Sequence, residues 1–382
     1  MFAERIKNRL TYQRKAGLLR NPAPVTRREG KYIFSGGRRI VNFASNDYLG
    51  LGCCAELGRC AARNFRRYGT SSSSSRLAGG NYSVISRAEK EYAAFFGYSD
   101  ALFFPSGYQA NMGLISTLLE RDDRVYFDKH IHASSVKGMI MSGSGLSGYN
   151  HNNLSHLERR LRSAGQHGRS AVLTESLFSM DGDILDAAEL KRLKDLYGFL
   201  AIVDEAHAFG VLGEGGRGIA GGVADIAVGT FGKAFGLFGA FVLLPEGFKD
   251  FLFNFSSPLI YTTTLPEAHA ATAVDALAIA ERSDGKRRHL RAACLLMKDR
   301  LLREGFRISG DAHILALEIG DENKAAEMSR RLFERGVFVL AARYPTVALN
   351  RAILRIGITA LHEEEDIDLF VKVVKEVHGE VE

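Results

Sequence analysis

The sequence predicts an α/β protein: a large domain with a mostly parallel sheet flanked by helices, and a smaller C-terminal α/β domain. Two observations support this class. Short apolar runs alternate with longer segments of helical periodicity through the middle of the chain, which is typical of a parallel sheet covered by helices. After about residue 266 the pattern changes to a long alanine-rich helix and a second alternating set. We expect three segments: 1–45 (N-terminal helix and hairpin), 46–265 (large domain) and 266–382 (small domain).

The N-terminal segment contains an expected helix and an expected hairpin. Apolar residues at near-helical spacing among Lys and Arg predict an amphipathic helix over 1–20. Two strand-like runs within 32–43 flank Gly36 and Gly37, which is typical of a tight turn between paired strands.

The large domain is expected to place active groups where strands end. We expect helices at 107–119, 153–163 and 187–197, and strands at 101–104, 124–128, 171–174, 200–204 and 238–244. Ser106, Asp204 and Lys233 each follow a predicted strand. Ligands of open α/β sheets bind beyond the carboxyl ends of the strands, so these residues are candidates for one site.

The small domain repeats the alternation with fewer strands. We expect helices at 267–282, 289–304, 323–335 and from 363 onwards, and strands at 314–319, 337–340 and 353–358.

Composition and charge restrict the kind of protein. The 382 residues are 46% hydrophobic and 25% charged, an ordinary globular mix. The net charge of +6 suits an anionic ligand such as a phosphate or a coenzyme A ester, whereas the short, scattered basic clusters argue against nucleic acid. Four cysteines without a CxxC pair argue against zinc and fit a reducing compartment, so we expect a cytoplasmic protein without a metal. The absence of a long apolar run predicts no membrane span.

Lys233 and Asp204 together indicate pyridoxal 5'-phosphate (PLP). Lys233 lies in Gly-Thr-Phe-Gly-Lys-Ala-Phe-Gly, with no other charge nearby. Apolar surroundings lower the pKa of a lysine and let its amine form an imine. Asp204 ends an apolar run, and a carboxylate there can hold the proton of a pyridinium nitrogen. A surface lysine and a helix-capping aspartate are the simpler alternatives.

Two histidines have candidate positions around such a ring. His207 follows Asp204 by three residues and could reach the ring's phenolic oxygen. His132 follows a predicted strand, and its imidazole is flat enough to stack on a pyridine. Because His130 lies two residues before it, a metal pair or two surface histidines remain alternatives.

Several hydroxyls and a helix start could bind a phosphate. Ser106, Gly107 and Tyr108 open a predicted helix, whose first N–H groups suit an anion. Thr230 offers a second hydroxyl, and Thr262 and Thr263 offer more, which could act across a dimer interface.

Three further features have both a functional and a structural interpretation. Glu175 begins a segment of acids and serines that could line the same cleft or form a turn. Arg355 is a charge within an apolar strand, so it holds either a substrate carboxylate or an internal partner. The five serines at 71–75 are either a linker or a ligand-binding loop.

Ordered motifs along nearly the whole chain resemble the α-oxoamine synthases, PLP enzymes of fold type I. They are Ser-Asn-Asp-Tyr-Leu-Gly from 45, Phe-Ser-Met-Asp-Gly-Asp from 178, Asp-Glu-Ala-His from 204, Gly-Glu-Gly-Gly-Arg-Gly from 213, Thr-Phe-Gly-Lys-Ala-Phe-Gly from 230, Pro-Thr-Val from 345, and the stretch 354–363.

The resemblance implies a decarboxylating condensation of an amino acid with an acyl thioester in a homodimer with shared active sites. It implies the following roles: Lys233 as the imine lysine and base, His132 stacked on the ring, Asp204 at its nitrogen, His207 at its oxygen, Ser179 and Thr230 at the cofactor, Gly107 and Tyr108 at its phosphate, and Arg20, Asn46, His132, Thr346 and Arg355 at the substrate.

Within the family, the phrase around Lys233 favours the branch that joins L-alanine to pimeloyl-CoA or a pimeloyl-carrier protein. Two departures leave the acyl donor open: the five serines at 71–75 replace a glycine-rich loop, and Phe238 replaces a small residue. Sister synthases with another acyl-CoA or amino acid, such as glycine C-acetyltransferase or acyl-amino-ketone signal synthases, are the alternative.

Overall fold

The computed structural model describes residues 1–163 and 169–381, which form two compact units. Unit 1 contains 1–50, 179–183 and 285–382, and unit 2 contains 51–178 and 184–284. This contact-based division differs from the three segments expected from the sequence. The N-terminal helix and hairpin join the C-terminal elements in unit 1. The alanine-rich helix belongs to unit 2, because it packs against two helices of that unit.

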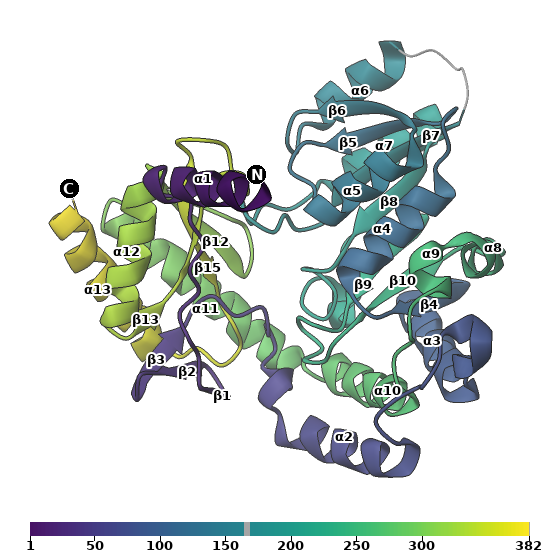
Figure 1. The fold of residues 1–382 in the computed structure, drawn as a ribbon, viewed down its shortest axis with the longest axis horizontal. Helices are drawn as coiled ribbons and strands as arrows, with labels where there is room; N and C mark the ends of the chain where they lie inside the picture. Colours follow the sequence, from purple (N-terminus) through teal and green to yellow (C-terminus); the bar gives the residue numbers. More distant parts are fainter. Residues whose placement is uncertain (164–168, 382) are drawn as a thin grey trace. The chain divides into compact units, whose positions relative to one another are not determined.

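Unit 2 is built on one seven-stranded sheet with helices packed against it (Figure 1). Its strands are β4 (Asp100–Phe104), β5 (Arg124–Asp128), β6 (Gly145–Tyr149), β7 (Ser170–Glu175), β8 (Leu200–Asp204), β9 (Ile226–Thr230) and β10 (Ala240–Leu244). Its helices are α2 (Ala55–Tyr68), α3 (Ser83–Phe96), α4 (Gly107–Leu118), α5 (Ala133–Ser142), α6 (Leu154–Ser163), α7 (Ala187–Tyr197), α8 (Phe248–Phe255), α9 (Ser257–Ile260) and α10 (Glu267–Glu281).

The strand order is β4-β10-β9-β8-β7-β5-β6, and only β10 runs antiparallel to its neighbours. The four parallel pairings place the carboxyl ends of β5, β7, β8 and β9 at one edge of the sheet. Strands that are covered on both faces are continuous apolar runs, which is why the sequence pattern located them. The expected mostly parallel sheet is therefore present.

A cluster of aromatic rings supports the segment around Lys233. Tyr92 of α3 packs 5.3 Å from Phe231 and 4.8 Å from Phe241 between ring centroids. Phe235 lies 6.0 Å from the same tyrosine, and all four rings are buried. Burying an aromatic side chain stabilises a fold by about 1.5–3 kcal/mol, so this cluster fixes the turn that carries the lysine.

The serine-rich segment is an ordered loop tied to a distant part of unit 2. Ser72 is buried and donates to the carbonyl of Thr264 at 2.7 Å, while the N–H of Thr264 donates to the carbonyl of Ser74 at 3.0 Å. Ser75 forms an antiparallel bridge with Thr263. The linker interpretation is therefore wrong, because backbone pairing orders both segments.

Arg76 anchors the end of this loop in the core. Its guanidinium donates to both carboxylate oxygens of Glu89, at 2.6 and 3.2 Å, and both side chains are almost completely buried. Lys249 lies 3.1 Å from the same carboxylate, and the N–H of Phe103 donates to it at 3.0 Å. A buried carboxylate needs such partners, since an unpaired buried charge is strongly destabilising.

Unit 1 contains two four-stranded sheets with the orders β1-β2-β3-β13 and β11-β12-β15-β14. Its strands are β1 (Arg27–Glu29), β2 (Tyr32–Ser35), β3 (Arg38–Asn42), β11 (Ile308–Ser309), β12 (Ile314–Gly320), β13 (Val337–Phe338), β14 (Leu340–Ala342) and β15 (Ala352–Gly357). Its helices are α1 (Phe2–Lys15), α11 (Asp284–Arg303), α12 (Glu322–Glu334) and α13 (Glu364–Val381). The expected strand 337–340 is divided, because β13 pairs with β3 and β14 pairs with β15.

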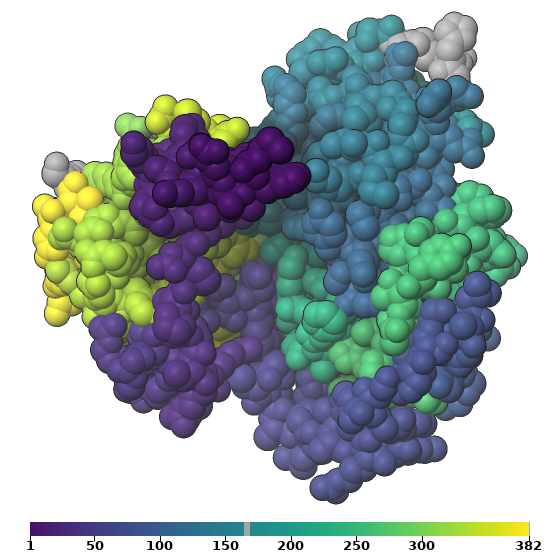
Figure 2. Space-filling view, viewed as in Figure 1, coloured from purple at the N-terminus to yellow at the C-terminus, as the bar shows by residue number. Residues whose placement is uncertain are grey.

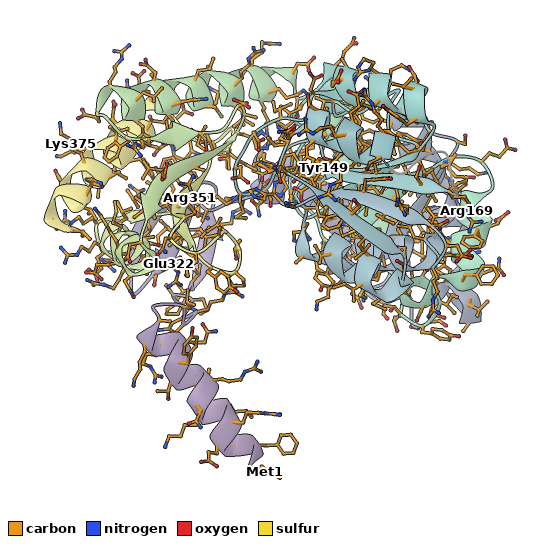
Figure 3. All side chains as sticks on the ribbon, turned by 90° about the horizontal axis from the view of Figure 1, so that it is seen from above. Met1, Tyr149, Arg169, Glu322, Arg351 and Lys375 are labelled. Atoms are coloured by element: carbon orange, nitrogen blue, oxygen red, sulfur yellow. The ribbon has the colours of Figure 1, made fainter. Side chains whose placement is uncertain are left out.

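Helix α1 lies on the surface with no buried residue (Figure 2). Figure 3 shows its side chains pointing outward around the helix, with Met1 labelled at the end. Phe2, Ile6 and Leu10 recur every four residues and are 70%, 56% and 48% exposed, so they form an uncovered apolar stripe. Across residues 1–163 and 169–381, no helix is both long and apolar enough to cross a membrane.

Candidate active site

Lys233 lies in a turn whose flanking residues are held in the core. Phe231 and Phe235 are buried on either side of it, while Lys233 itself is partly exposed. The N–H of Gly236 donates to the carbonyl of Lys233 at 3.0 Å, and the N–H of Leu237 donates to the carbonyl of Phe231 at 2.9 Å. The two buried rings therefore fix the backbone that carries the Lys233 side chain.

Asp204 ends β8, opposite Glu175 in the parallel register with β7. Its Oδ1 accepts from the N–H of Ala206 at 2.9 Å, and its Oδ2 accepts from Nδ2 of Asn111 at 2.8 Å. Both donors stabilise the ionised carboxylate and define its orientation. One further lone pair remains on each oxygen for a donor on a ligand.

His132 caps the start of α5, and its ring is electrostatically coupled to both Asp204 and Lys233. Its Nδ1 lies 2.6 Å from Oγ of Ser134. His132 is exposed on one side, but the protein around the rest of the ring removes water from it and so lowers the pKa of the imidazole. The Asp204 carboxylate opposes this shift and the Lys233 amine adds to it. Three residues that are far apart in the sequence thus form one cluster.

The neighbouring histidine makes separate contacts. The ring of His130 stacks on His151 with centroids 4.0 Å apart, and Nδ1 of His151 lies 3.0 Å from Oδ1 of Asp128. His132 turns instead toward Ser134. The two histidines of the His-x-His sequence therefore contact different residues within unit 2.

The start of α4 offers an anion-binding position near His132. Ser106 is the N-cap, and its Oγ accepts from the N–H of Gln109 at 3.2 Å. The N–H groups of Gly107 and Tyr108 precede the first helical hydrogen bonds and so have no partner within the helix. The Tyr108 ring lies 6.4 Å from the His132 ring, nearly perpendicular to it. A phosphate bound at this helix start would therefore be close to His132.

The remaining candidate cofactor-binding residues of unit 2 differ in their hydrogen bonds and their burial. The Thr230 hydroxyl donates to the carbonyl of Gly239 at 2.9 Å and accepts from the N–H of Gly232 at 3.1 Å, so it stabilises the Lys233 turn. Glu175 and His207 are buried at the carboxyl ends of β7 and β8.

Thr263 pairs with Ser75 of the serine loop, and Thr262 directly precedes it. Thr263 is exposed, and Thr262 is partly exposed. Both hydroxyls therefore lie at the surface of unit 2.

Arg355 is a buried cation in unit 1. Its Nε donates to the carbonyl of Ser179 at 2.5 Å, and its Nη2 donates to Oδ1 of Asn46 at 3.3 Å and to the hydroxyl of Tyr48 at 3.4 Å. It is 3% exposed, so these three acceptors hold its guanidinium inside unit 1. The hydrogen bonds to a carbonyl, an amide oxygen and a hydroxyl carry no negative charge, and a carboxylate would complement this cation.

Arg20 and Thr346 lie at the surface of unit 1. Arg343 connects their two segments: its guanidinium donates to the carbonyls of Gly17 and Leu19, and its own carbonyl accepts from the N–H of Thr346 at 2.9 Å. These contacts bring the two predicted substrate residues onto neighbouring segments.

Asn111, Ser134 and Glu205 were not singled out by sequence reasoning. Asn111 and Ser134 connect Asp204 with His132. Glu205 is buried, and its carboxylate accepts from the N–H of Ala220 at 2.7 Å and of Ile219 at 3.0 Å. Burial raises its pKa to about 7, partly offset by these hydrogen bonds. Asn111 lies four residues after Gly107 on the same helix, and no pattern in the sequence marks its role.

An amine, a carboxylate and a flat imidazole near the carboxyl ends of parallel strands fit the class of PLP-dependent enzymes. Consistent with this class, a family model described as aminotransferase class I and II matches residues 38–374, and the chain belongs to that family.

Relatives define the branch of the family. The 8-amino-7-oxononanoate synthase of Geobacter sulfurreducens is 37% identical over 384 residues, covering 98% of each chain. The crystal structure of 8-amino-7-oxononanoate synthase from Francisella tularensis matches with a TM-score of 0.77 and 31% identity, over 89% of this chain and 98% of that one. Serine palmitoyltransferase from S. paucimobilis with bound PLP-myriocin aldimine matches with a TM-score of 0.92 and 25% identity, over 98% and 97%. The assignment to the α-oxoamine synthases, PLP-dependent acyltransferases of fold type I, is confirmed.

Proposed function

We propose that this enzyme condenses L-alanine with pimeloyl-CoA or a pimeloyl-carrier protein, with loss of CO₂, to give 8-amino-7-oxononanoate. The observation that carries the proposal is the hydrogen-bonded connection of Asp204 with His132 at the carboxyl edge of the sheet, where β9 leads into the Lys233 turn. The names of the relatives at 37% and 31% identity support this choice of substrates.

The residues present fit PLP. Lys233 offers the amine that holds the aldehyde, and the Asp204 carboxylate, already fixed by two donors, can hold the proton of the ring nitrogen. The exposed face of His132 can stack on the ring, and the N–H groups of Gly107 and Tyr108 can bind the phosphate. When bound, PLP supplies an electron sink for a carbanion formed on the amino acid.

The protein's own groups then bind the substrate and move its proton. Arg355 binds the amino acid carboxylate, because a buried guanidinium held by neutral acceptors suits a bidentate anion. Nζ of Lys233 takes the α-proton of the amino acid. The Nε2 side of His132 faces the carboxylate of the amino acid that is lost as CO₂. Ser179 and Asn46, which contact Arg355, keep its guanidinium oriented. Arg20 and Thr346, which are exposed on unit 1, are further substrate-binding positions.

We also propose a homodimer in which each active site uses both copies. Phe238, Tyr261 and Leu77 of unit 2 are 64%, 81% and 67% exposed, and a partner that covers them would bury their apolar surface. Thr262 and Thr263 adjoin Tyr261, so a second copy would bring these hydroxyls to the partner's phosphate. A mass of one chain in multi-angle light scattering at micromolar concentration would contradict the dimer.

Covalent trapping tests the role of Lys233. After incubation with PLP and reduction by borohydride, the wild type should gain the mass of one phosphopyridoxyl group on the peptide that contains residue 233. Lys233→Ala should not gain it, whereas Lys137→Ala, which removes an exposed lysine of α5, should be labelled like the wild type. Equal labelling of Lys233→Ala and the wild type would overturn the assignment.

A second candidate, a serine or glycine acyltransferase of the same family, is favoured by one observation. The serine palmitoyltransferase structure superposes with a TM-score of 0.92, against 0.77 for the oxononanoate synthase. Thiol release should be measured with alanine, serine and glycine, each combined with pimeloyl-, palmitoyl- and acetyl-CoA. Alanine with the pimeloyl donor should be fastest, and faster release with serine and palmitoyl-CoA would establish the alternative.

A further inference from the structure

Asn111 and Ser134 form a continuous hydrogen-bonded chain between Asp204 and His132. Nδ2 of Asn111, on α4, lies 2.8 Å from Oδ2 of Asp204 and 3.1 Å from Oγ of Ser134, on α5. Oγ of Ser134 lies 2.6 Å from Nδ1 of His132. Asn111 is 4% exposed and Ser134 is fully buried, so water does not compete for these bonds.

The neighbours determine which way the Asn111 amide points. A flipped amide would place its oxygen 2.8 Å from a carboxylate oxygen, and two acceptors at that distance repel each other. Nδ2 therefore donates one hydrogen to Asp204 and the other to Ser134. Oγ of Ser134 consequently accepts, and its own hydrogen remains available to donate.

The same reasoning places the proton on the imidazole of His132. The backbone N–H of Ser134 points at Nδ1 from 3.3 Å, and the Ser134 hydroxyl hydrogen has Nδ1 as its near acceptor at 2.6 Å. A hydrogen on Nδ1 would face the N–H group, so Nδ1 must be an acceptor. The ring proton therefore lies on Nε2.

We propose that Asn111 and Ser134 are positioning residues that orient the Asp204 carboxylate and fix His132 as its neutral Nε2–H tautomer. One amide serves both groups, so the residue that holds the ring-nitrogen partner also sets the proton position of the stacking imidazole. The benefit of this orientation for catalysis rests on the proposed function. The consequence of this orientation is that His132 presents a single donor, Nε2–H, to a bound substrate.

Nitrogen NMR tests the proton position without relying on activity. The full-length protein is labelled with ¹⁵N-histidine and measured before and after saturation with PLP, and the His132 signals are assigned by their absence in His132→Gln. At neutral pH the wild type should show a bare Nδ1 and a protonated Nε2. A protonated Nδ1 would overturn the proposal.

Ser134→Ala tests the hydroxyl, with Ser135→Ala as the matched control because Ser135 is a buried serine of the same helix. Loss of the donor to Nδ1 should raise the midpoint of the His132 titration by about half to one pH unit and give mixed tautomers. Ser135→Ala should behave like the wild type. An unchanged titration in Ser134→Ala would refute the role of the hydroxyl.

Asn111→Leu tests the amide with a similar volume and no donors. The His132 signals should shift toward mixed tautomers, and kcat should fall about tenfold or more while KM for the amino acid changes little, since Arg355 is untouched. A residue that only stabilised the fold would lower the melting temperature and leave the ¹⁵N pattern intact. If Lys233 is not labelled by PLP and borohydride but the ¹⁵N pattern holds, the proposed function fails and this inference stands. If Lys233 is labelled but the ¹⁵N pattern shows a protonated Nδ1, this inference fails and the proposed function stands.

Discussion

Replacing Gly236 by alanine should destabilise the protein for two separable reasons. Its φ of +67° is a conformation that residues with a Cβ adopt at a cost of about 1–2 kcal/mol. In addition, an alanine Cβ would lie 2.2 Å from the backbone nitrogen of Gly52 and 2.5 Å from the carbonyl carbon of Leu51. Backbone atoms cannot rotate away as a flexible side chain can, and forced overpacking costs about 1–3 kcal/mol. The sum is about 2–5 kcal/mol.

Gly221 and Gly222, which follow each other in the sequence, allow the conformational cost and the steric cost to be measured separately. Gly222 has a φ of +80° but open space where an alanine Cβ would lie, so Gly222→Ala should lose only the conformational part, about 1–2 kcal/mol. Gly221 has open space and an ordinary φ, so Gly221→Ala should change the free energy of unfolding by no more than about 0.5 kcal/mol.

Urea unfolding of the three variants, followed by one probe under one set of conditions, gives the differences. Gly236→Ala should be less stable than Gly222→Ala by about 1–3 kcal/mol. It should also be labelled more slowly in the borohydride assay, because Gly236 bonds to the carbonyl of Lys233. A difference below about 0.5 kcal/mol between these two variants would refute the steric reasoning.

Three other changes have defined outcomes. Arg76→Met should lower the free energy of unfolding by about 3–5 kcal/mol, because it removes one partner of a buried carboxylate. The control Arg63→Met breaks an exposed ion pair and should cost less than about 1 kcal/mol. Similar losses of stability for both variants in thermal melts would contradict this prediction. The pKa of Glu205 rises on folding from 4.5 to about 7, so folded protein binds more protons and stability should fall by about 3 kcal/mol between about pH 4.5 and 7. Glu205→Gln should remove this part of the slope in urea titrations; an unchanged slope would show that the carboxyl titrates normally. Asp204→Asn should retain PLP absorbance but lose about 10²-fold or more in kcat, and near-normal turnover would refute the electrostatic role.

Local patterns located most of the elements that position the site. The run ending at Asp204 was recognisable because a strand buried on both faces is apolar throughout. The surroundings of Lys233 were recognisable because Phe231 and Phe235 must be buried, and the structure places both in the aromatic cluster. His132 followed from its position after β5. In each case the decisive information lies within a few residues of chain.

Features that depend on distant parts of the chain could not be predicted. Asn111 is one amide in an ordinary helix, and its role exists only because α4, α5 and the end of β8 meet. The segment 337–340 carries one apolar pattern, yet it divides because β13 finds its partner in the N-terminal hairpin. The order in the serine loop likewise comes from residues near Thr264. Sequence spacing does not record such pairings.

The bond between Ser72 and Thr264 closes a chain segment of 192 residues. Bringing such remote ends together costs about 4–5 kcal/mol of chain entropy, far more than one hydrogen bond returns. The serine loop therefore orders only after the sheet between its two ends is assembled, and it is among the first places to open. Hydrogen exchange at the N–H of Thr264 would consequently report the earliest loosening of unit 2, before the sheet itself melts.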